Sequence, residues 1–212
     1  MPSPRDMPQS KKDLVDVFID YENVRKIARN QFCSFTAEPH EGMVDPLALA
    51  ELICAKRNRP STLRRVRVYR GRPVPQKQPK PAQYFDLHAA DWRRNSQLEL
   101  ISRPLKYFRP DPSGQPNFEL ATEKGIDVSL AIDLVETVTG DNPPDVAIVF
   151  SNDTDLLPAV ELSYRRGTHT EVACWEGSHG LRFEQGKNMP MWCHIMEKAD
   201  FFTTCTDDLY SI

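Results

Sequence analysis

Four aspartates occupy positions where carboxylates could meet in the folded chain. Asp20 ends an apolar, β-branched run, and Asp153 and Asp155 directly follow a second such run. Asp127 lies in the first turn of a predicted amphipathic helix. Like charges a few ångströms apart repel strongly in a partly desolvated site, so such a cluster either takes up protons or binds cations.

Divalent metal ions are the simplest way to balance this charge. A ligand set of carboxylates without Cys or His suits Mg²⁺ or Mn²⁺, which also bridge phosphate oxygens. Such an ion lowers the pKa of a bound water and neutralises charge on a scissile phosphate. The pattern therefore favours phosphoryl transfer to water, with Asp155 or Asp127 as an acceptor for the water's proton.

Structural roles are the main alternative for these residues. The chain has 30 acidic residues among 212, and an Asp at a helix start is usually a cap, which alone could explain Asp153 or Asp155. Asp20 is harder to explain in this way, because a carboxylate beside buried surface ionises at a cost unless it has a partner. Asp133 follows Asp127 by six positions, about 600° around a helix, so we expect a supporting or solvated residue.

Alternating strands and helices must position these side chains. The β-branched runs predict strands at 14–20, 62–69, 98–102, 145–151 and 171–175, and the apolar periodicity predicts helices at 46–57, 82–97 and 125–140 and from about 155. We expect loops at 73–81 and a loop or hairpin at 104–123. This alternation predicts an α/β fold, a three-layer α/β/α Rossmann-like domain whose central sheet is mainly parallel. The carboxyl ends of parallel strands then converge on one crevice.

Length and composition fit one domain. We expect a flexible N-terminal leader at 1–12, a single domain at 13–205 and a C-terminal tail at 206–212. The formal charge of −3 excludes the strongly basic character of proteins that coat nucleic acid, so a nucleic-acid partner would need a local basic patch. The five cysteines form no C-x-x-C pair, and no segment approaches the about 20 apolar residues of a membrane span. These features predict reduced thiols and a cytoplasmic protein.

Three motifs carry a family resemblance. Residues 18–23 (FIDYEN), 124–128 (KGIDV) and 151–155 (SNDTD) resemble, in order and spacing, the NYN domain. This family is a branch of the PIN-like nuclease superfamily and includes the LabA-like proteins. The resemblance runs over roughly 14–202 and implies a PIN-like fold, a Mg²⁺ or Mn²⁺ site and cleavage of RNA.

The resemblance also assigns roles to individual positions. Asn23 matches an Asn that helps to arrange the end of the first strand, and Ser151 is expected to support the site beside it. Asn152 and Thr154 depart from the Gly and Ser that are common in the family, which would alter the loop but not the carboxylates. The catalytic and metal-binding residues implied by the match are Asp20, Asp127, Asp153 and Asp155.

A phosphodiester substrate also needs positive charge near the carboxylates. We favour Lys124, Arg70 and Arg72 for this role, because they lie next to the motifs or at a predicted strand end. Further candidates, for which a solvated face is the favoured interpretation, are Arg25, Arg93, Arg94, Lys106 and Arg109. Tyr21 and the loop at 175–177 could stack bases or could equally be packing aromatics, and packing is favoured for Trp175.

The sequence thus predicts a metal-dependent nuclease, with RNA favoured over DNA and endonucleolytic cleavage favoured. The main alternative is a catalytically silent PIN-like module that binds RNA or a regulatory protein partner, and a homodimer is also open. A haloacid-dehalogenase-like phosphatase would need a second Asp two residues after Asp20, where Glu22 stands. A nicotinamide dehydrogenase would need G-x-G-x-x-G after the first strand, which is absent.

Overall fold

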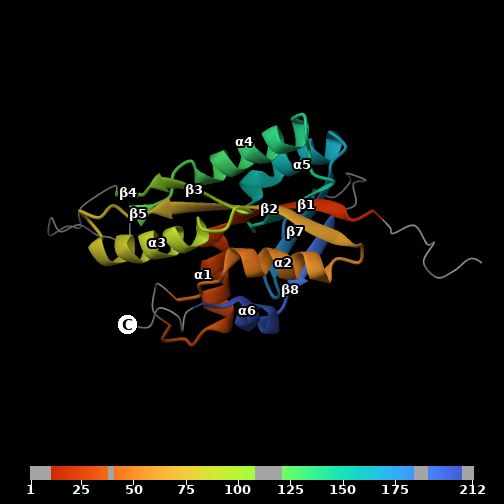
Figure 1. Ribbon diagram of the computed structural model, residues 1–212. Coiled ribbons are helices and arrows are strands. Elements are labelled where there is room, and N and C mark those ends of the chain that lie inside the picture. The colour runs from red at the N-terminus through yellow and green to blue at the C-terminus, as the bar shows by residue number, and fades with distance from the viewer. Residues whose placement is uncertain (1–10, 38–40, 108–120, 184–190, 207–212) are drawn as a thin grey trace, which may run out of the picture.

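A six-stranded parallel sheet with helices on both faces forms the centre of the molecule (Figure 1). The computed structural model describes residues 11–37, 41–107, 121–183 and 191–206. The strand order is β3-β2-β1-β6-β7-β8, and every neighbouring pair is parallel. The predicted α/β class with a mainly parallel sheet is therefore confirmed.

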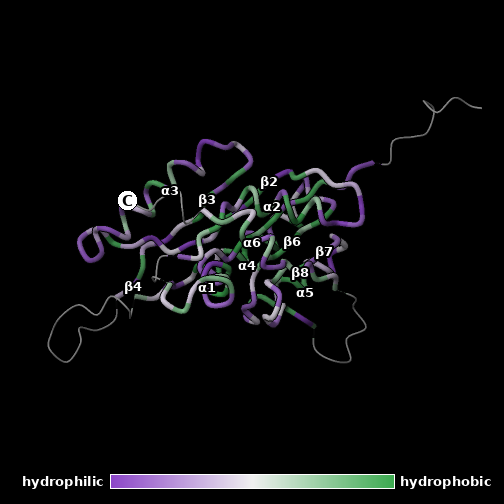
Figure 2. Tube along the Cα trace, turned by 90° about the horizontal axis from the view of Figure 1, so that it is seen from below, coloured by the Kyte–Doolittle hydropathy of each residue, from purple (hydrophilic) through white to green (hydrophobic). Residues whose placement is uncertain are grey.

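The strands follow the β-branched runs of the sequence. Their bounds are β1 Asp13–Asp20, β2 Ser61–Arg72, β3 Leu98–Pro104, β6 Val146–Phe150, β7 His169–Trp175 and β8 Trp192–Met196. All five residues of β6 and the last six of β1 are buried, as expected for central strands covered on both faces. Figure 2 shows this distribution, with the hydrophobic segments gathered in the interior.

The chain changes direction across the sheet between β1 and β6. It runs outward from β1 to β2 and β3, and then returns to place β6 on the other side of β1. Ligands of open α/β sheets bind outside the carboxyl ends of the strands at such a switch point. Here those ends are Asp20, which lies within the first motif, and Phe150, which directly precedes the third.

Two helical layers cover the sheet. One face carries α1 (Tyr21–Phe32), α2 (Pro46–Lys56), α3 (Pro79–Trp92) and α6 (Lys198–Thr204), and the other carries α4 (Ile126–Thr139) and α5 (Leu157–Arg165) (Figure 1). A short 3₁₀ turn, η2 (Thr154–Leu156), precedes α5. Each layer has its own apolar cluster, with Val24 and Leu49 in the first and Leu130 and Val160 in the second.

Local capping signals position two of the predicted helices. The Asp45 carboxylate accepts a hydrogen bond from the backbone N of Ala48 at 2.7 Å, and Pro46 opens α2 as predicted. After α5, Gly167 adopts a φ of +92°, a conformation that side-chain-bearing residues rarely take.

Some elements differ from the sequence expectation. The helix α1 was not predicted, although it buries Tyr21, Val24 and Ala28 on one face, because its many charged residues obscure the apolar spacing. Neither β8 nor α6 was predicted, and α3 begins at Pro79 inside the expected loop and ends at Trp92. These are short or strongly polar segments, whose structure depends on packing against the rest of the chain.

The predicted loop or hairpin at 104–123 contains a two-stranded antiparallel pair, β4 (Lys106–Tyr107) and β5 (Ala121–Thr122). Residues 108–120 between them, including Arg109, lie outside the described residues. So do residues 1–10 of the expected leader and 207–212 of the expected tail. Among the residues that are described, no helix combines the length and apolar character needed to cross a membrane.

Candidate functional site

Three of the four predicted carboxylates meet at the carboxyl edge of the sheet. Asp127, Asp153 and Asp155 each offer an oxygen, and these oxygens lie within 4.8 Å of one another. Asp127 comes from the first turn of α4, while the other two follow β6. Asp153 also caps η2, because its Oδ1 accepts a hydrogen bond from the Asp155 backbone N at 3.0 Å. Capping and cluster formation are therefore compatible at this residue.

Asp20 lies beside this cluster but is not one of the three. It ends β1, is 8% exposed, and accepts a hydrogen bond from the Ser151 hydroxyl at 2.8 Å. The same hydroxyl oxygen accepts a hydrogen bond from the Asp153 backbone N at 3.0 Å. Ser151 thus connects Asp20 to the motif that carries Asp153.

The pKa of Asp20 shows how unfavourable its charge is in the absence of a cation. This pKa is raised from 3.8 to about 6, mainly by burial; the hydrogen bonds from Ser151 and the Asn23 backbone lower it, and the charges of Asp153 and Glu22 add to the increase. No Lys or Arg within the described ranges forms an ion pair with Asp20 or with the three clustered aspartates. The site therefore has an uncompensated negative charge.

A divalent cation fits this ligand set. All of the donors are carboxylate oxygens, two of the three clustered side chains are partly buried, and neither His nor Cys belongs to the group. Oxygen-rich sites with open positions for water are typical of Mg²⁺ and Mn²⁺. Asp127, Asp153 and Asp155 are the residues that could hold such an ion, and Asp20 is close enough to add charge.

Glu123 is a further carboxylate that the sequence analysis missed. Its Oε1 accepts a hydrogen bond from the backbone N of Gly71, and a Cβ at Gly71 would lie 2.7 Å from the Glu123 Cγ. Burial, and then the charges of Glu22 and Asp20, raise its pKa from 4.5 to about 7. Only the approach of β2 to the segment before α4 brings this side chain to the site, so no local signal identified it.

Glu22 is a neighbouring carboxylate whose pKa is lowered, in contrast to that of Glu123. Burial would raise its pKa, but the charges of Arg70 and Arg25 outweigh this effect and lower it to about 2. Arg70 Nε lies 3.0 Å from a Glu22 oxygen, and its guanidinium packs over the rings of Tyr21 and Phe85. Arg70, which was predicted to bind nucleic acid, is therefore already engaged inside the protein.

The other predicted binding residues differ in their surroundings. Arg72 forms a two-bond ion pair with Asp86, at 2.9 and 2.8 Å, on the exposed side of α3. Lys124 is exposed and lies next to the start of α4. Of the two roles open for Tyr21, the structure shows packing and not base stacking, because this residue is fully buried and its hydroxyl donates to the Val44 carbonyl. Trp175 is also fully buried, as the packing interpretation predicted.

Two asparagines hold the loop after β6. Asn23 Oδ1 accepts a hydrogen bond from the Asn152 backbone N at 3.0 Å, which connects α1 to the SNDTD motif. The Asn152 side chain donates to the His179 carbonyl at 2.8 Å, while its own Oδ1 is buried without a hydrogen-bond partner in the described structure. Asp133 stays outside the cluster and accepts a hydrogen bond from the Tyr69 hydroxyl.

Comparison with known proteins decides the family. The family model of the NYN domain matches residues 14–182, a range that contains all three motifs. The chain belongs to the NYN domain family. NYN domains are part of the PIN-like nuclease superfamily, so the predicted resemblance is confirmed and a nuclease-type fold is established.

The remaining comparisons add little to this assignment. A solved structure of a protein of unknown function from Vibrio parahaemolyticus is similar to this NYN domain, with 18% identity and a TM-score of 0.46, over 79% of this chain and 85% of that one. The search of curated proteins found no match. The geometry of the NYN site itself must therefore carry the functional argument.

Proposed function

We propose that this NYN domain is a metal-dependent ribonuclease that hydrolyses phosphodiester bonds at the carboxyl edge of its sheet. The observation that carries the proposal is the group of three carboxylates, Asp127, Asp153 and Asp155, whose oxygens lie within 4.8 Å of one another without a compensating cation among the described residues. Mg²⁺ or Mn²⁺ would supply that charge. RNA is favoured over DNA because of the family's expected activity.

Each residue has a defined task in this proposal. The three clustered aspartates bind the ion, which, when bound, activates a water and neutralises charge on the scissile phosphate. Asp20, held by Ser151, contributes its charge from the β1 side of the site. Asp155 is the most exposed of the three clustered carboxylates and is the favoured acceptor for a proton from water.

Asn23 and Ser151 keep the ligand loop in place. Through the Asn152 backbone N, Asn23 fixes the residue immediately before Asp153, and Ser151 fixes Asp153 itself through its backbone N. Such supporting hydrogen bonds orient metal ligands, and their loss typically reduces affinity or activity by about 10–100-fold. Neither residue has to contact the substrate to influence the reaction.

The deciding experiment is cleavage of labelled single-stranded RNA and of the matching DNA with Mn²⁺, with Mg²⁺ and with EDTA. Asp153→Asn is the informative variant, because Asn also caps helices well and should preserve η2 while removing a ligand charge. Asp141→Asn is the matched control, since Asp141 is exposed in the turn after α4.

We expect metal-dependent cleavage of RNA that is lost in Asp153→Asn and retained in Asp141→Asn. Binding of RNA without cleavage under any metal condition would instead support the alternative, a catalytically silent module. Equal cleavage by Asp153→Asn and the wild type would overturn the assigned site.

A further inference from the structure

Positive charge is concentrated in one part of this acidic protein. Residues 71–107, which we call the distal arm, contain seven Lys and Arg and three Asp and Glu, a formal charge of +4. Because the whole chain has a charge of −3, the remainder carries −7. The distal arm comprises the end of β2 with α3, β3 and β4, and the last residues of β2 and β3 extend past Asp20, the carboxyl end of β1 (Figure 1).

Most of the arginines on β2 are already neutralised. Arg65 faces Glu99 at 3.7 Å, Arg70 pairs with Glu22, and Arg72 pairs with Asp86. Arg103, on the neighbouring strand β3, has no carboxylate partner in the described part of the chain. Its Nη1 donates only a long hydrogen bond, 3.4 Å, to the carbonyl of Gly125.

Arg103 also has a suitable position. It pairs with Gly71 in the register of β2 and β3, so it lies at the carboxyl edge of the sheet. Its Nη1 is 3.1 Å from the place that a Cβ on Gly125 would occupy, and Gly125 precedes the metal-site candidate Asp127 by two residues. The exposed guanidinium therefore lies beside Gly125 at the start of α4, the helix whose first turn carries Asp127.

We infer that Arg103 binds a phosphate of the nucleic-acid strand next to the one held at the carboxylates, and that the distal arm carries the adjoining part of that strand. The inference rests on the proposed function. A guanidinium offers a planar set of donors that matches a phosphate with two parallel hydrogen bonds. Two further cations of the distal arm are exposed to solvent: Lys77, which precedes α3, and Lys80, which lies in its first turn.

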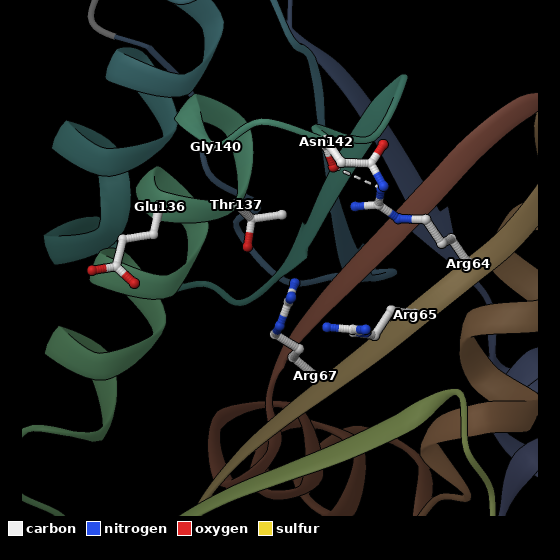
Figure 3. A pocket seen from close by; sticks show the side chains of 7 residues that line it. All are labelled: Arg64, Arg65, Arg67, Glu136, Thr137, Gly140 and Asn142. Carbon is white, nitrogen blue, oxygen red and sulfur yellow. Dashed lines mark hydrogen bonds between the residues drawn. The ribbon is translucent and has the colours of Figure 1, made fainter.

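A second group of arginines is a weaker candidate for phosphate binding. Arg64, Arg65 and Arg67 line a cavity of about 290 Å³ between β2 and the end of α4 (Figure 3). The buried Asp16 accepts hydrogen bonds from both Arg64 and Arg67, and Glu136 also lines the cavity. The positive charge there is balanced inside the protein, so an incoming phosphate would compete with carboxylates that are already bound.

The first test measures binding without turnover. The affinity of fluorescein-labelled single-stranded RNA is followed by anisotropy in EDTA at several salt concentrations, for wild type, Arg103→Ala and Arg65→Ala. We expect Arg103→Ala to bind roughly tenfold more weakly, because a charge-assisted hydrogen bond is lost. The slope of log K against log salt should decrease by about 1. Arg65→Ala, which removes an equal charge from a paired position, should bind as the wild type does.

The second test asks whether the place of the charge matters. Two double variants change the net charge by the same amount. One combines Lys77→Glu with Lys80→Glu, and the other combines Arg165→Glu with Arg166→Glu. The second pair lies exposed at the end of α5, away from the distal arm. We expect only the distal-arm pair to weaken RNA binding strongly, and thermal unfolding should show that all variants remain folded.

The outcomes separate this inference from the proposed function. If the wild type binds RNA but cleaves nothing, the ribonuclease proposal fails while the binding assay still tests the distal arm. If the wild type cleaves RNA and Arg103→Ala binds with unchanged affinity and salt slope, the role of Arg103 is overturned. Equal weakening by the two charge-reversal pairs would likewise overturn the assignment of the strand to the distal arm.

Discussion

Glu171, near the amino ends of the strands, and Asp20, at their carboxyl edge, have pKa values shifted in opposite directions. Near the amino ends of the strands, Glu171 accepts from Arg57 at 2.8 Å and lies 2.6 Å from His194 Nε2, and Arg57 also pairs with Asp13. Burial would raise the pKa of Glu171, but its hydrogen bonds with His194 and Arg57 lower it to about 2. At the carboxyl edge, burial raises the pKa of Asp20 to about 6.

This difference separates a structural cluster from a functional one. Both edges bury acidic side chains, and desolvation disfavours the charged form in both places. The amino edge supplies the Arg57 guanidinium, directly after α2, and a hydrogen bond with His194 of β8, whereas the carboxyl edge supplies no cation to the aspartates within the described residues. Charge that the fold leaves uncompensated is available for an external cation. The following predictions test this comparison, from the largest expected effect to the smallest.

Removal of the amino-edge cation should strongly destabilise the protein. Arg57→Ala leaves Glu171 and Asp13 without their shared partner, and breaking a buried pair in this way costs about 3–5 kcal/mol. The measurement is urea unfolding at pH 7. Arg59→Ala is the control, because Arg59 is 68% exposed and its pair with Asp13 should contribute less than about 1 kcal/mol. Similar stabilities for the two variants would show that the ion pairs of Arg57 contribute little to the stability of the fold.

Removal of a carboxylate at the carboxyl edge should reduce cleavage without reducing stability. Asp127→Asn is expected to lower metal-dependent cleavage at least about 100-fold, beyond the range seen for residues that only support a ligand. Its stability without metal should be unchanged or higher, because repulsion within the cluster is relieved. Steady-state cleavage and urea unfolding of the same preparation measure both quantities. A large loss of stability would show that Asp127 stabilises the fold, as the ion-paired carboxylates of the amino edge do.

The raised pKa of Asp20 should make the stability of the protein depend on pH. Because its folded pKa of about 6 exceeds the unfolded value of 3.8, the folded state binds the proton more tightly. The contribution of Asp20 to stability should therefore fall as pH rises from about 4 to about 6, and that of Glu123, whose pKa is raised to about 7, should fall between about pH 4.5 and 7. Asp20→Asn should remove the Asp20 part of this decline, leave the part due to Glu123, and be more stable than the wild type by about 1–3 kcal/mol at pH 8 without metal.

Urea unfolding between pH 4 and 8 in EDTA tests this prediction. Glu171→Gln is the informative companion, because the pKa of Glu171 is lowered and its contribution is lost only as pH falls from about 4.5 towards 2. The decline between pH 4 and 6 should persist in Glu171→Gln. If the decline between pH 4 and 6 is as large in Asp20→Asn as in the wild type, Asp20 does not cause it.

The smallest effect is expected at the residue that departs from the family pattern. Asn152→Gly removes the side-chain bond to the His179 carbonyl but keeps the backbone N that Asn23 holds. We expect a stability change of about 1 kcal/mol or less and cleavage within roughly tenfold of the wild type. Asn23→Ala removes the other bond and should lower cleavage more. The opposite ranking would show that the Asn152 side chain is the main support of the ligand loop.

Much of the site could be predicted from local patterns. The β-branched runs before Asp20 and Asp153 correctly indicated parallel strands, and strand direction then placed both residues at one edge. The apolar periodicity after Asp127 placed it in the first turn of α4. Glu123 could not be found in this way, because it reaches the site only through its hydrogen bond to Gly71, 52 residues away in sequence.

The sequence by itself determined the alternating elements, the parallel sheet and the carboxylates at its carboxyl edge, since these depend on short-range periodicity and on the geometry of parallel strands. Only the tertiary structure decided which charges are compensated. From the sequence, Arg70 and Arg72 were candidates for phosphate binding, but in the structure they form ion pairs with Glu22 and Asp86. Arg103 was not a candidate from the sequence. Ion pairing depends on separations of a few ångströms and on local burial, which sequence spacing does not specify.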